Sequence, residues 1–172
     1  MRQFDTAGNM TDSLAALTCL VHSGFQGWEE ALERFYRRWE KDPLVLDKWF
    51  AIQAGAPRID VLKDVERLLG HPAFNLANPN KVRALLGTFC ARNLVRFHEQ
   101  SGSGYRFLVD RVLELDRINA QVAARLLQPL TGWRRYDGGR QALMRGELQR
   151  ILEQDPLSGD VYEVAGKSLG TD

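Results

Sequence analysis

Hydrophobic side chains recur every three or four residues along most of the chain, which is the spacing of amphipathic helices. The clearest case lies between residues 28 and 40, where Glu and Arg side chains occupy the face opposite an apolar stripe. That stripe consists of Trp28, Leu32, Phe35, Tyr36 and Trp39. A second helix has local start and stop signals, because Asp42 is a good N-cap, Pro43 suits the first helical position, and Gly55 is a usual C-terminal stop.

The same reasoning predicts helices along the rest of the chain. Further helices are expected within residues 11–21, 59–70, 78–89, 93–100, 101–119, 119–130, 140–154 and 157–169. Thr11 and Asn119 are predicted as N-caps, and either Ser158 or Asp160 caps the last helix. Pro129 should kink or end the helix that contains it, because proline lacks the N–H that the helix needs.

These helices predict the fold class. No segment shows the alternating pattern of a strand, and a new helix starts roughly every 15 to 20 residues, so that consecutive helices form pairs of about 30 to 40 residues. Each such pair can bury one face against its neighbours. We therefore expect one all-α domain over residues 1–172, built as a superhelical solenoid of paired antiparallel helices of the HEAT or armadillo type.

Composition and charge limit the classes of partner that the chain is expected to bind. Hydrophobic residues make up 44% and charged residues 26% of the chain, and the formal net charge is +1. Basic clusters are interleaved with acidic residues, so we expect no nucleic-acid partner. No apolar stretch approaches the ~20 residues that span a bilayer, so we expect a soluble cytoplasmic protein without a membrane partner. Cys19 and Cys90 are far apart and are predicted to be free thiols.

Few residues are candidates for catalysis or for metal binding. The histidines His22, His71 and His98 have no second ligand at metal-binding spacing, so structural or exposed roles are favoured. The chain also lacks a serine nucleophile motif and a phosphate-binding loop. We therefore predict no catalytic residue and no metal ligand in this chain, and no enzymatic activity of the chain alone.

Two arginines lie in unusual contexts. Arg83 is close to a helix N-terminus, where the helix dipole opposes a cation. Arg125 lies among alanines and leucines, with Gln121 one turn earlier on the same face, so that it could project from a wall into a cavity. The pattern alone also allows ordinary surface arginines in ion pairs.

Several sequence segments, taken in order, resemble one family. They are NMTDSLAALTCLV, DPLVLDKWFAIQA, NPNKVRALLGTF, the segment from FH through GSGYRFLVDRVLELDRINAQVAARLLQPL, RRYD and LSGDVYE. Together they resemble the C-terminal domain of bacterial aminopeptidase N, a zinc-dependent gluzincin. The resemblance extends from about Asn9 to Leu169.

This resemblance implies a role within a larger enzyme. In the family, the all-helical C-terminal domain packs over the catalytic domain of the same polypeptide and encloses the substrate chamber. The His-Glu-x-x-His zinc motif and the Gly-x-Met-Glu-Asn substrate loop lie upstream, and neither occurs in this chain. The resemblance thus implies zinc in the complete enzyme, a peptide substrate, and a non-catalytic role for this chain. Arg83, Gln121 and Arg125 match positions expected to line the chamber and to gate or orient the peptide.

Two other functions stay open from the sequence. One is a free-standing helical-repeat scaffold that binds another protein in its concave face. The other is a stand-alone hydrolase, which has no nucleophile, metal set or carboxylate pair in view. Aminopeptidase activity or stoichiometric zinc in the pure chain would favour the hydrolase.

Overall fold

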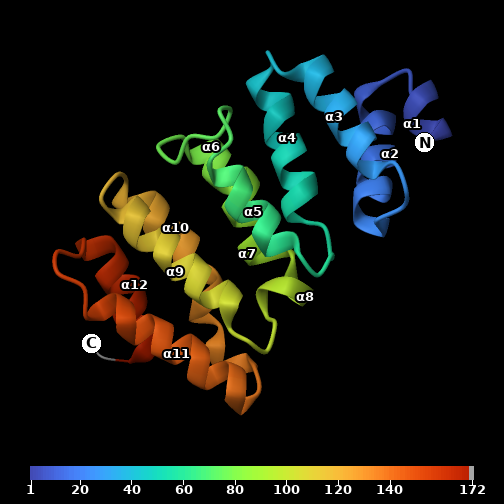
Figure 1. Ribbon diagram of the computed structural model, residues 1–172. Helices are drawn as coiled ribbons and strands as arrows, with labels where there is room; N and C mark the ends of the chain where they lie inside the picture. The colour runs from blue at the N-terminus through green and yellow to red at the C-terminus, as the bar shows by residue number, and fades with distance from the viewer. Residues whose placement is uncertain (171–172) are drawn as a thin grey trace. The chain divides into compact units, whose positions relative to one another are not determined.

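The structure, a computed structural model, describes residues 1–170, and within this range every regular element is helical (Figure 1). The chain divides into two compact units. Unit 1 comprises Met1–Asn75 and Asn80–Asn93, and unit 2 comprises Leu76–Pro79 and the chain from Leu94 onward. Each unit is built from packed helices, so the predicted all-α class is confirmed.

Unit 1 places one long helix, α4, at the centre of its packing. The helices of this part of the chain are α1 (Arg2–Thr6), α2 (Met10–Ser23), α3 (Trp28–Trp39), α4 (Pro43–Ala54), α5 (Val61–Leu69), α6 (Pro79–Val82) and α7 (Thr88–Arg92). A π-helical segment, η1 (Arg83–Gly87), lies between α6 and α7. Helix α4 packs against α2, α3, α5, α7 and η1, which explains why most of its residues are apolar.

Capping residues account for the helix starts in unit 1. The Asp42 side chain accepts hydrogen bonds from the backbone N–H groups of Leu44 and Val45, with Pro43 as the first residue of α4. The predicted cap of α2, Thr11, is wrong. Helix α2 begins at Met10, and Asn9 caps it by accepting from the Asp12 N–H at 2.9 Å. Because Asn9 caps the free N–H groups of the first turn, the helix starts before Thr11, which is already helical.

The described part of unit 2 contains four long helices and two short ones. They are α8 (Leu94–Phe97), α9 (Ser103–Asp116), α10 (Ala120–Thr131), the 3-10 turn η2 (Trp133–Arg135), α11 (Gly138–Leu152) and α12 (Gly159–Leu169). Helices α9 and α10 lie side by side (Figure 1), and α10 and α11 each also pack against α12. The core of the unit includes Tyr105, Leu108, Leu127 and Leu148, all fully buried.

The predicted helix ends in unit 2 are largely confirmed. Asn119 caps α10, and Ser158 rather than Asp160 caps α12. Pro129 lies inside α10, which continues for two residues beyond it and ends at Thr131, so the interruption expected at the proline was placed two residues too early. Helix α11 starts two residues before the predicted Arg140, because Asp137 accepts from the Arg140 N–H and sets the first turn at Gly138.

Candidate functional site

Arg83 is the first residue of the π-helical segment η1 and is exposed, whereas Lys81, Val82, Ala84 and Leu85 around it are buried. The segment is defined by a hydrogen bond from the Thr88 N–H to the Arg83 carbonyl, five residues apart. Short π-helical segments are rare and often occur at functional sites. The continuous α-helix predicted over residues 78–89 is therefore wrong at this point, because η1 replaces its second turn.

Asn80 is a partner of Arg83 that was not predicted from the sequence. Its Oδ1 accepts a hydrogen bond from Arg83 Nη2 at 3.2 Å. This bond uses one of the five N–H donors of the guanidinium group. The spacing of three residues along a helix was the available signal.

Gln121 and Arg125 lie one turn apart on the exposed face of α10. The residues between and after them, including Ala123, Ala124 and Leu126, are buried, since the apolar face of α10 packs against α9 and α12. Within residues 1–170, no ion pair involves Arg125. The structure thus brings Gln121 and Arg125 together as predicted, while Arg83 belongs to the other compact unit and is considered by itself.

His98 is buried in unit 2, and both of its ring nitrogens contact tyrosine hydroxyls. Nδ1 lies 2.9 Å from the Tyr105 hydroxyl and Nε2 lies 2.8 Å from that of Tyr136. The ring also stacks on Tyr136, with 4.2 Å between the ring centroids. The neighbouring Arg140 donates to the His98 carbonyl at 2.7 Å, and its own charge is paired with Asp137. The network ties the turn before α9 to the start of α11.

Hydrogen-bond capacity assigns the protonation state of this histidine. Tyr105 is fully buried beside Arg140, which can only donate, so the tyrosine O–H needs His98 Nδ1 as its acceptor. Nε2 then carries the hydrogen and donates to Tyr136. Burial, with the positive charge of Arg140 adding to it, lowers the pKa of His98 below its ordinary value. The imidazole is therefore a neutral structural group, consistent with the structural role predicted from the sequence.

A buried ion pair in unit 1 connects two helices. Lys81 is 5% exposed, and its Nζ lies 2.7 Å from both Asp47 Oδ1 and the Pro43 carbonyl. These contacts join the helix that precedes Arg83 to the N-terminal turn of α4.

Side chains that could bind a metal ion are scattered over the two units. Among residues 1–170 no set of three or more His, Cys, Asp or Glu side chains is arranged to hold a metal ion. The residues in this range therefore do not fit a zinc ion, and they supply no ligand set for a zinc-dependent step. No helix in this part of the chain has both the length and the apolar character to cross a bilayer.

The chain is similar in sequence to known proteins. A family model described as a domain of unknown function (DUF3458_C) with ARM repeats matches residues 1–170. Aminopeptidase N of Caulobacter vibrioides is 48% identical over 97% of this chain, and aminopeptidase N of Escherichia coli is 42% identical over 98%. The chain spans only 19% of each relative.

A solved structure is also similar. It is the crystal structure of Legionella pneumophila aminopeptidase A in complex with aspartic acid, which superimposes with a TM-score of 0.93 at 40% sequence identity. The match covers 99% of this chain and 20% of that protein.

Proposed function

The chain belongs to the DUF3458_C family of ARM-repeat domains, found at the C-terminus of aminopeptidase N-type enzymes, and from this premise we propose that it serves a zinc aminopeptidase as a non-catalytic domain. The ARM-repeat description agrees with the predicted helical-repeat fold. In this proposal the zinc ion and the catalytic groups belong to the rest of a polypeptide about five times longer, because the chain spans 19% of its relatives. The parent enzyme removes N-terminal residues from peptides in the cytoplasm.

Within that enzyme, the domain encloses the substrate chamber and orients the peptide. The observation that carries this part is the exposed pair Gln121 and Arg125, because Arg125 has no ion-pair partner within residues 1–170 although it lies on a wall of packed helices. A guanidinium group can form two parallel hydrogen bonds with a carboxylate. Arg125 is therefore proposed to bind the C-terminal carboxylate of a short peptide, with Gln121 as a hydrogen-bonding neighbour. Arg83 is proposed, separately, as a second chamber-lining cation.

Kinetics of the complete enzyme test the role of Arg125. We expect Arg125→Ala to raise KM about tenfold for tripeptides with a free C-terminal carboxylate, because a hydrogen bond to a charged group contributes about 1.5–3 kcal/mol. KM for an uncharged aryl-amide substrate should stay within about twofold, because that substrate has no carboxylate for the guanidinium to bind. The measurement is steady-state kinetics of the wild type and the variant with both substrates.

Arg117→Ala is the matched control, since Arg117 is an exposed arginine of the same unit at the end of α9. This variant should leave KM unchanged for both the tripeptide and the aryl amide. Arg125→Lys should give an intermediate value with the tripeptide, because lysine keeps the charge but not the two-pronged geometry. An equal rise of KM for the tripeptide and the aryl amide in Arg125→Ala would exclude the carboxylate role. KM of the Arg83→Ala variant is measured for the same two substrates, and the two values are compared in the same way.

A further inference from the structure

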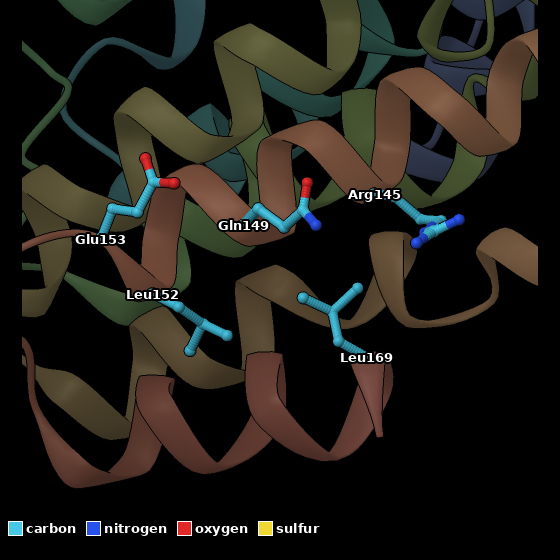
Figure 2. A pocket seen from close by; sticks show the side chains of 5 residues that line it. All are labelled: Arg145, Gln149, Leu152, Glu153 and Leu169. Atoms are coloured by element: carbon cyan, nitrogen blue, oxygen red, sulfur yellow. The ribbon is translucent and has the colours of Figure 1, made fainter. Parts of the chain in front are cut away.

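A groove between α11 and α12 of unit 2 is not used by the proposed function. Its volume is about 320 Å³, at the lower end of the range for small-molecule sites. Figure 2 shows the side chains that line it. The lining residues are Arg145, Gln149, Leu152, Glu153 and Leu169.

The polar side chains of the groove form an ordered row. Arg145, Gln149 and Glu153 follow one another at intervals of four residues, so they share one face of α11. All three are exposed, and within residues 1–170 neither Arg145 nor Glu153 takes part in an ion pair. The row therefore has a cation at one end, an anion at the other and an amide between them.

Each end of the row is suited to a charged group of opposite sign. Glu153 is the C-cap of α11, where the helix dipole and the terminal carbonyl groups already favour a cation and oppose a carboxylate. An ammonium group bound there would relieve this repulsion. At the other end, the Arg145 guanidinium lies 5.3 Å from the centroid of the Trp133 ring, and the Arg134 guanidinium lies 4.2 Å from the same centroid. A guanidinium group beside an aromatic ring can still bind a carboxylate through its N–H groups.

Two leucines lie at the space between the two helices. Leu152 and Leu169 are both half-buried, and Figure 2 shows their side chains in the gap between α11 and α12. They offer a contact surface for an aliphatic side chain beside the polar row.

We propose that this groove binds a short zwitterionic peptide, with its ammonium group at Glu153, its carboxylate at Arg145 and an aliphatic side chain against Leu152 and Leu169. The length agrees, because eight helical residues rise about 12 Å and an extended tripeptide spans about 10 Å. The Gln149 amide can hydrogen-bond the peptide backbone between the two charged ends. This inference does not depend on the function proposed above.

An NMR titration of the 172-residue chain with the tripeptide Ala-Leu-Ala tests the proposal. The Trp133 indole is a built-in reporter, because its ring faces Arg145 and its N–H donates to the Ser168 carbonyl at 3.2 Å. We expect saturable shifts of the Trp133 indole and of amides in α11 and α12. N-acetylated and C-amidated forms of the peptide should each bind about tenfold more weakly, since each lacks one charge-assisted contact.

Two variants assign the ends of the peptide. Glu153→Gln should bind the free and the acetylated peptide equally, and Arg145→Gln should bind the free and the amidated peptide equally. Arg117→Gln, which removes the same charge elsewhere in unit 2, should behave as the wild type. Absence of saturable shifts, or unchanged discrimination between free and blocked peptides in both variants, would show that the groove is only a solvated surface depression and would overturn the proposal.

Discussion

Gly104→Ala is expected to destabilise the protein by about 3 kcal/mol, at the upper end of overpacking costs. Gly104 is the second residue of α9, and a Cβ atom at this position would lie 2.4 Å from the Phe97 carbonyl oxygen and 3.0 Å from the Phe97 Cα. The obstructing atoms belong to the backbone of α8, so no side-chain rotation relieves the clash. Urea denaturation of the 172-residue chain, followed by far-UV circular dichroism, measures the change in the free energy of unfolding.

Gly146→Ala provides the matched control. Gly146 lies inside α11 of the same unit, and a Cβ atom there would meet nothing within 4 Å. Alanine should stabilise the protein by about 0.5–1 kcal/mol at this position, because it has a higher helix propensity than glycine. A Gly104→Ala variant as stable as the wild type would contradict the close approach of α8 to α9.

Asp47→Ala is expected to cost about 3 kcal/mol or more of the free energy of unfolding, because it leaves the buried Lys81 ammonium without its counter-charge. Lys81 is 5% exposed, and the 2.7 Å bond to the Pro43 carbonyl is the polar contact that remains to it. The double variant Asp47→Ala with Lys81→Met should recover part of this loss, because methionine needs no partner in an apolar site. Urea denaturation of both variants gives the two values.

Glu33→Ala is the control for burial. The ion pair between Glu33 and Arg37 is also 2.7 Å long, but both side chains are more than half exposed. Removing it should change the free energy of unfolding by about 0.5 kcal/mol or less. Equal losses in Asp47→Ala and Glu33→Ala would contradict the assignment of Lys81 to the core of unit 1.

The features that the sequence predicted well are those set by neighbouring residues. Asp42 with Pro43, Asn119 and Ser158 all cap helices where capping preferences place them. The shared face of Gln121 and Arg125 also follows from their spacing of four residues. These interactions involve groups within one or two helical turns, so the order of residues is sufficient to predict them.

Features set by tertiary contacts could not be predicted. A π-helical turn contains one residue more than an α-helical turn, and the apolar pattern around Arg83 fits both, so only the packing of η1 against α4 and α5 distinguishes them. The tyrosine partners of His98 are 7 and 38 residues away in sequence. Likewise, the groove at Arg145 requires Leu169 from another helix. The exposure of Arg83 and Arg125 is established, and their roles in substrate binding remain predictions.

The measurement that tests the proposed function most directly is the native size of the protein that carries this chain. An antibody raised against the chain would be used to follow it through size fractionation of a lysate of the source cells, with an aminopeptidase assay on each fraction. We expect a denatured band about five times larger than 19.5 kDa, since the chain spans 19% of its relatives, in the fractions that contain the activity. A band near 19.5 kDa, separated from the activity, would contradict the account and favour a free-standing helical-repeat scaffold.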